Sequence, residues 1–60
     1  MTNKSSAYRK GYETARMFIE TGDIKGLHKH MVEVVTLSDD YFEGLASAEF
    51  DHENGNGWEF

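Results

Sequence analysis

Apolar residues recur at helical spacing in two neighbouring segments of this 60-residue chain, and only three residues separate the segments. The apolar side of residues 6–20 contains Tyr8, Gly11, Tyr12, Ala15, Phe18 and Ile19. The apolar side of residues 24–36 contains Ile24, Leu27, His28, Met31, Val34 and Val35. Steps of three and four residues place such positions on one side of an α-helix. The short break predicts an antiparallel helical hairpin, because it leaves little chain to separate the two helices.

The residues at the break and at the first helix start match known capping preferences. Gly22 is suited to end the first helix and Asp23 to cap the second, while Ser5 or Ser6 can cap the first. Gly11 stands inside the first apolar side, where glycine costs about 1 kcal/mol relative to alanine. We therefore expect another helix to approach the backbone closely at Gly11.

A third, shorter helix is predicted over residues 39–51, with Ser38 as its N-cap. Asp39 and Asp40 occupy its first turn, where the helix dipole favours acidic side chains. Residues 52–60 show no periodicity and contain Gly55-Asn56-Gly57. The expected fold is all-α: one helical domain over residues 1–51, with the third helix as a cap or docking element, followed by a flexible acidic and aromatic tail over residues 52–60.

The chain is short and has no cysteine, so no disulfide can stabilise it. A chain of this length buries only about 60% of its unfolded surface, and association is the usual remedy. We therefore expect a homodimer. The side chains expected to be buried between the two copies are Tyr8, Tyr12, Phe18, Ile19, Leu27, Met31, Val35, Tyr41, Phe42 and Leu45. Met17 and Val32 lie outside the apolar sides, as ordinary exposed residues or as parts of a second contact surface.

The composition and residue spacing argue against several classes of protein. No apolar run approaches the roughly 20 residues of a membrane span, and the N-terminus leads into no signal-like apolar segment. His28 and His30 lie two residues apart, so they diverge on a helix and cannot chelate one metal ion. Asp39 and Asp40 suit a helix N-terminus better than a catalytic pair. We therefore expect no enzyme activity, cofactor or metal.

Charge is divided unevenly along the chain. All six lysines and arginines lie in residues 1–30, which carry a net charge of +3, whereas residues 31–60 carry eight acids and a net charge of −8. The acidic half can lie against the basic half, within the chain or across a dimer, or can simply be solvated. The third helix and the tail are the predicted contacts with a protein partner. The residues expected to make these contacts are Asp39, Asp40, Phe42, Glu43, Phe50, Trp58 and Phe60.

Two alternatives to this partner surface stay open. The ring of Trp58 can instead fold back onto the core of its own chain. The basic half can contact nucleic acid, although a sequence pI of about 4.9 argues against it. The residues of this alternative nucleic-acid face are Arg9, Lys10, Arg16, Lys25 and Lys29.

In overall character the chain resembles the small early accessory proteins of lambdoid bacteriophages. The resemblance consists of a very short, cysteine-free, acidic and helical chain with a polar start, Met1-Thr2-Asn3-Lys4-Ser5-Ser6. It carries no functional residue across. It implies a non-enzymatic protein of the bacterial cytoplasm that binds a host or phage regulator.

Overall fold

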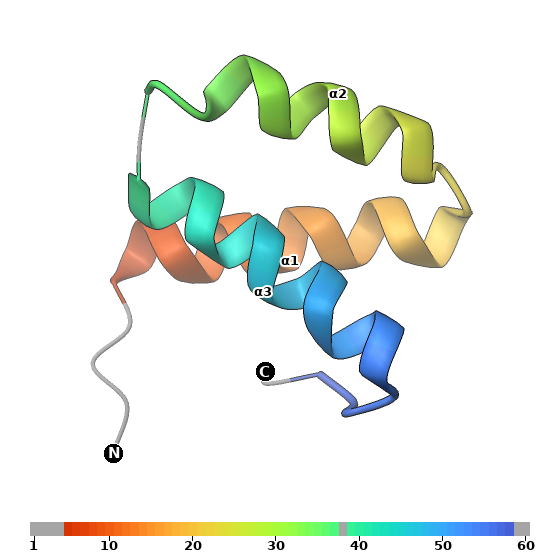
Figure 1. Cartoon of the computed structure of the whole chain (residues 1–60). Coiled ribbons are helices and arrows are strands. Elements are labelled where there is room, and N and C mark those ends of the chain that lie inside the picture. The colour runs from red at the N-terminus through yellow and green to blue at the C-terminus, as the bar shows by residue number, and fades with distance from the viewer. Residues whose placement is uncertain (1–4, 38, 59–60) are drawn as a thin grey trace.

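The computed structural model describes residues 5–37 and 39–58, and it is all-helical over these residues. Three helices follow in order: α1 over Ser6–Thr21, α2 over Ile24–Val34 and α3 over Asp39–Asn54. α1 and α2 run antiparallel, and α3 returns in the direction of α1 and crosses it at an angle (Figure 1). The predicted all-α class is confirmed. No strand forms in the described residues, including the β-branched segment around Val32 and Val34.

The structure confirms the predicted capping residues at the start of α1 and in the turn between α1 and α2. The Ser5 hydroxyl accepts a hydrogen bond from the Tyr8 backbone N–H at 3.1 Å. Gly22 has φ 80°, in the left-handed region, and the Gly22 and Asp23 N–H groups donate to carbonyls of Ile19 and Phe18. The Asp23 carboxylate accepts from the Gly26 N–H at 3.0 Å. Ser38, the predicted cap of α3, lies outside the described residues.

Two helix ends differ from the prediction. α2 ends at Val34, two residues before the predicted end, and the Leu37 N–H donates to the Val34 carbonyl in the turn that follows. α3 continues to Asn54, three residues beyond its predicted end. The Asn54 side chain donates to the Phe50 carbonyl at 2.9 Å, and Gly55 then reverses the chain with φ 67°. The predicted boundary between domain and tail therefore falls inside α3.

The closest helix pair is α1 with α3, rather than the predicted hairpin of α1 with α2. Gly11 and Gly44 face each other at the crossing. A Cβ atom on Gly11 would collide with the Tyr41 carbonyl, and one on Gly44 would collide with the Tyr8 carbonyl. The expected close approach at Gly11 is thus confirmed, and α3 is the helix that approaches. Glycine allows this contact because it has no side chain to separate the backbones.

The core lies mainly between α1 and α3, and α2 closes it from one side. The buried apolar residues are Tyr8, Tyr12, Ala15, Ile19, Leu27, Leu45 and Ala48. Leu27 is the one fully buried residue of α2. Larger side chains from Phe18 and His30 stand between α1 and α2, with ring centroids 5.9 Å apart, so α2 sits farther from α1 than α3 does.

Several residues that were expected to be buried by dimerisation are already buried within one chain. Tyr8, Tyr12, Ile19, Leu27 and Leu45 all belong to the internal core. The physical reason is that α3 covers the apolar side of α1 itself, where a second copy was expected to lie. A contact between copies would have to use other residues.

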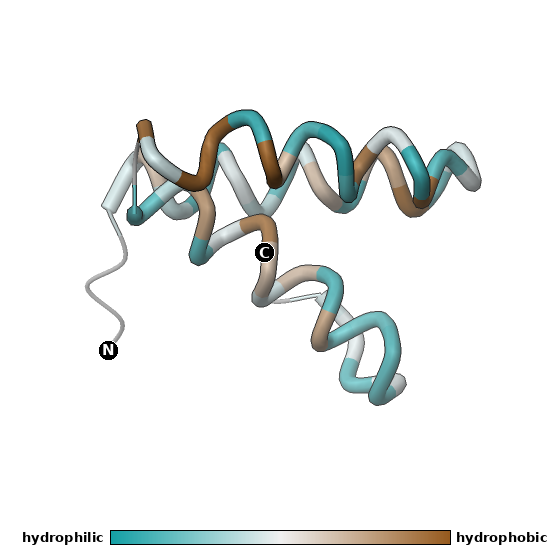
Figure 2. Tube along the Cα trace, turned by 45° about the horizontal axis from the view of Figure 1, so that its top comes forward, coloured by the Kyte–Doolittle hydropathy of each residue, from teal (hydrophilic) through white to brown (hydrophobic). Residues whose placement is uncertain are grey.

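Hydrophobic residues recur along α1 and α2, whereas the C-terminal part of α3 is mainly hydrophilic (Figure 2). Within residues 5–37 and 39–58, no helix combines the length and apolar character that crossing a membrane requires.

Candidate functional site

The structure divides the predicted partner-binding residues among four places. Asp39, Glu43 and Phe50 lie on the solvent-facing side of α3, and Phe42 lies on the side of α3 that faces α2. Asp40 contacts Ser5, and Trp58 packs against α1. Phe60 is outside the described residues. These residues therefore do not form one continuous site.

Asp39, Glu43 and Phe50 form what we call the α3 outer face. Steps of four and seven residues place them along one side of the helix. All three are exposed, and the Phe50 side chain is 61% exposed. A large exposed aromatic residue among carboxylates is typical of a contact residue rather than of a core residue.

Phe42 contributes to an open apolar groove between α2 and α3. The groove has a volume of about 310 Å³ and is lined by His28, Met31, Val32, Val35 and Phe42. We call it the α2–α3 groove. Val32 is 73% exposed and Val35 is 43% exposed, which shows that the wall formed by α2 is not covered within the chain. Phe42 therefore belongs to a different surface from Phe50.

Asp40 has a local structural contact. The Ser5 hydroxyl donates to the Asp40 carboxylate at 3.0 Å while it accepts the capping hydrogen bond of α1. Asp40 thus links the start of α3 to the start of α1. This contact separates Asp40 from the α3 outer face in role as well as in position.

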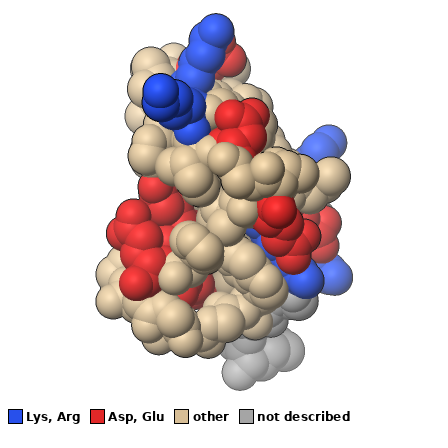
Figure 3. Space-filling model, turned by 90° about the vertical axis from the view of Figure 1, so that its right-hand side faces the viewer, with Lys and Arg blue, Asp and Glu red and all other residues tan. Residues whose placement is uncertain are grey.

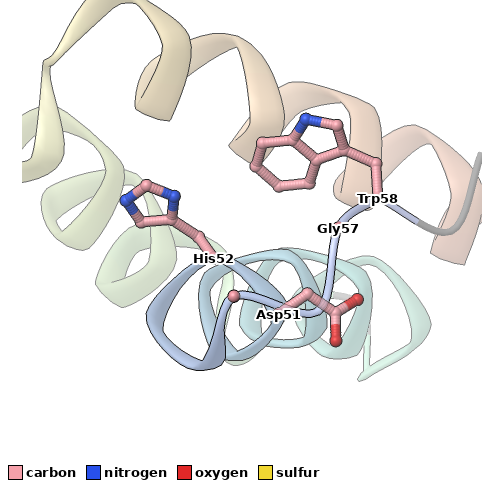
Figure 4. A pocket seen from close by; sticks show the side chains of 5 residues that line it. Asp51, His52, Gly57 and Trp58 are labelled. Atoms are coloured by element: carbon pink, nitrogen blue, oxygen red, sulfur yellow. The ribbon is translucent and has the colours of Figure 1, made fainter.

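Trp58 lies in the angle between α1 and α3 and packs against the core. Its position is therefore that of the alternative in which the ring folds back onto its own chain. The ring stacks on the His52 ring with centroids 6.2 Å apart, and it is perpendicular to the Tyr12 ring, also with centroids 6.2 Å apart. The Arg16 guanidinium lies 5.3 Å from the Trp58 ring centroid. Figure 4 shows Trp58, His52 and Asp51 around a small pocket that Gly55 and Gly57 also line.

Tyr12 and Asp51 make the longest-range hydrogen bond in this region. The Tyr12 hydroxyl donates to the Asp51 carboxylate at 2.5 Å. This contact joins the middle of α1 to the last turns of α3, directly beside Trp58. The pocket next to Trp58 is therefore bounded by side chains that already contact one another.

The two histidines of α2 point to different residues of α3. His28 Nε2 contacts the Glu49 carboxylate, and His30 Nε2 lies 2.8 Å from the Tyr41 hydroxyl. Both contacts fasten α2 to α3. In the described ranges, no three side chains of His, Asp or Glu gather at a distance suited to one metal ion.

The residues of the alternative nucleic-acid face spread over two helices. Arg9 pairs with Glu13 at 3.3 Å, and Arg16 pairs with Glu20 at 3.2 Å, each within α1. Lys10 is exposed on α1, while Lys25 and Lys29 are exposed one turn apart on α2. Acidic and uncharged side chains separate the basic side chains on the surface that Figure 3 shows. The two arginines therefore have nearby carboxylates that reduce their charge toward a phosphate backbone.

Sequence reasoning missed three residues that organise these surfaces: Gly44, Glu49 and Asp51. Gly44 had a signal, because a glycine inside a helix usually has a packing reason. Glu49 and Asp51 had none, since their partners His28 and Tyr12 are distant in the sequence and an acid gives no sign of which residue it will meet.

Comparisons with known proteins assign no family to the chain. No protein-family model, no curated protein and no solved structure matches it. The functional argument therefore rests on the surfaces described above.

Proposed function

We propose that this chain is a small non-enzymatic regulatory protein that acts by contact with another protein through the α3 outer face. The observation that carries the proposal is the exposure of Phe50, at 61%, on the same side of α3 as Asp39 and Glu43. The complementary partner surface would hold an apolar pocket for Phe50 with lysine or arginine around it.

The resemblance to early accessory proteins of lambdoid bacteriophages supports a bacterial setting for this function. In that setting the partner is a host or phage regulator in the cytoplasm. A role as a binding inhibitor or adaptor needs no catalytic group on this chain, which agrees with a contact made by one aromatic side chain and two carboxylates.

The test is site-specific photo-crosslinking in bacterial cells. A photoreactive amino acid in place of Phe50 is expected to capture a defined partner, and the same amino acid in place of Met17 is not. Met17 is a suitable control because it is 67% exposed on α1, away from this face. Purified partner should then lose binding to Phe50→Ala and to the Asp39→Lys, Glu43→Lys double variant, with folding checked by circular dichroism.

Asp40 is kept unchanged in this double variant, because its contact with Ser5 supports the α1 cap. Binding that survives both variants, or that is lost equally in Met17→Ala, would contradict the proposal.

The alternative function is a nucleic-acid-binding module that uses Arg9, Lys10, Arg16, Lys25 and Lys29. The pairing of Arg9 and Arg16 with glutamates weighs against it. Binding to a DNA or RNA duplex that falls steeply with salt and disappears in Arg9→Ala, Arg16→Ala and Lys25→Ala would favour this alternative over protein contact.

A further inference from the structure

We infer that the α2–α3 groove is a self-association face, which a second copy of this chain covers in a two-fold symmetric dimer. This contact lies beyond the proposed partner contact, because it uses α2 and the α2-facing side of α3 rather than the α3 outer face. It also differs from the dimer expected from the sequence, whose central residues are buried within one chain.

The first argument is the uncovered apolar surface of the groove. Val32 and Val35, at 73% and 43% exposure, stand beside Met31 and Phe42 in a single groove. Valine is less favourable in a helix than alanine or leucine. Because Val32 is mostly exposed, the isolated chain offsets little of this cost, and burial against a second surface would offset more of it.

The second argument is the distribution of charge along the two rims of the groove. Lys25 and Lys29 lie on α2, where each precedes a groove residue by three positions: Lys25 precedes His28 and Lys29 precedes Val32. Residues at this spacing are neighbours on the surface of a helix. Glu49 contacts His28 of the groove, and Glu53 follows Glu49 by one helical turn on the same side of α3.

A groove whose α2 rim carries two lysines beside Glu33, and whose α3 rim carries acidic side chains, selects among possible occupants. A uniformly basic helix would meet the acidic rim favourably but would be repelled by Lys25 and Lys29. A uniformly acidic segment, or nucleic acid, would be repelled by Glu49 and Glu53. A second copy brings both signs, and a two-fold axis that runs along the groove places the α2 rim of each copy against the α3 rim of the other.

The size of the chain supports the same conclusion. Among residues 5–37 and 39–58, the core consists of seven buried apolar residues, which is little apolar burial for a folded chain. Covering the groove in both copies would add two equal apolar contacts at once, since every contact in a two-fold interface occurs twice.

Sedimentation equilibrium over a concentration series tests the inference with the full chain. The wild-type chain is expected to form a dimer, and Val32→Glu is expected to raise the dimer dissociation constant about a hundredfold, because the interface would bury an unpaired carboxylate twice. Met17→Glu is the matched control, with a similar exposure on α1, and is expected to dimerise like the wild type. Circular dichroism and thermal melting verify that both variants fold.

A charge-exchange experiment tests the two rims separately. Lys29→Glu and Glu53→Lys are each expected to weaken self-association about tenfold, and an equimolar mixture of the two is expected to form a mixed dimer more stable than either variant alone. Phe50→Ala should leave the dimer intact, so failure of the partner contact and failure of the self-association face give different results.

The inference is overturned if the wild-type chain is monomeric at millimolar concentration, if Val32→Glu dimerises normally, or if Met17→Glu disrupts the dimer equally. It is also overturned if the mixture of Lys29→Glu and Glu53→Lys shows no preference for the mixed dimer.

Discussion

Gly11 and Gly44 determine how closely α1 and α3 approach. Each lacks the Cβ atom that would meet a backbone carbonyl of the other helix. The glycines lower the intrinsic stability of their helices, and the contact between α1 and α3 offsets this cost. Around them, Tyr12 buries its ring and donates its hydroxyl to Asp51, so one residue joins the apolar core to the polar end of α3.

Adding one methyl group at this crossing is expected to destabilise the protein. Gly11→Ala and Gly44→Ala should each lower the free energy of unfolding by about 1–3 kcal/mol, because overpacking exceeds the gain in helix propensity. Urea denaturation measures the change. Gly22→Ala is the control without crowding, since nothing beyond its chain neighbours lies within 4 Å of an added Cβ atom. Its expected loss of about 1–2 kcal/mol reflects only the left-handed backbone. Unchanged stability in both crossing variants would contradict the close approach.

The three helices contribute unequally to the fold. α1 and α3 share most of the packing, whereas α2 is attached through Leu27, through the His28–Glu49 contact and through His30 with Tyr41. The His28–Glu49 contact is exposed, and contacts of this kind between surface side chains stabilise proteins by at most about 1 kcal/mol. The His30–Tyr41 hydrogen bond is partly buried, and a hydrogen bond contributes about 1 kcal/mol. Leu27 is therefore the main apolar anchor of α2.

Truncation of this anchor gives a prediction for α2. Leu27→Ala should lower the free energy of unfolding by about 2–5 kcal/mol, because it removes a fully buried side chain and leaves a cavity. His28→Ala, on the same helix but largely exposed, should cost less than about 1 kcal/mol. Thermal melting followed by circular dichroism compares the two. Equal losses would show that Leu27 is not the anchor.

The helices and the first turn could be predicted from the sequence because their signals are local. Apolar spacing, Gly22 and the caps Ser5 and Asp23 all act within a few residues. The pairing of α1 with α3 could not, because it depends on Gly44 meeting Gly11 across the chain. Likewise, exposed Phe50 and half-buried Phe42 are both aromatic residues of α3, and only the packing of α2 separates the two surfaces to which they belong.

At the scale of the whole molecule, the C-terminal turn is packed onto the helices. Gly55 and Gly57 both have positive φ, and they reverse the chain so that Trp58 reaches Tyr12 and Arg16 on α1. This arrangement covers the angle at which α3 diverges from α1. It leaves two uncovered surfaces considered for partners: the α3 outer face, to which Glu43 belongs, and the α2–α3 groove, to which Phe42 belongs.

Removal of the Trp58 ring is expected to weaken the whole fold. Trp58→Ala should lower the free energy of unfolding by about 1–3 kcal/mol, less than for a fully buried tryptophan because Trp58 is only half-buried. Phe50→Ala provides the comparison and should change stability by less than about 0.5 kcal/mol, since Phe50 is exposed. Chemical denaturation measures both. A loss confined to Phe50→Ala would reverse the assignment of structural and contact roles.

Trp58 is also the only tryptophan in the chain. Excitation at wavelengths that only tryptophan absorbs therefore gives fluorescence from Trp58 alone. The His52 imidazole stacks on this indole, and the Arg16 guanidinium lies over it. The spectrum of the unlabelled protein thus carries a local signal for the junction of α1, α3 and the C-terminal turn. A partner that displaces this turn from α1 would change the wavelength and the intensity of the Trp58 fluorescence. A contact confined to the side of α2 that faces away from α1 would leave both unchanged.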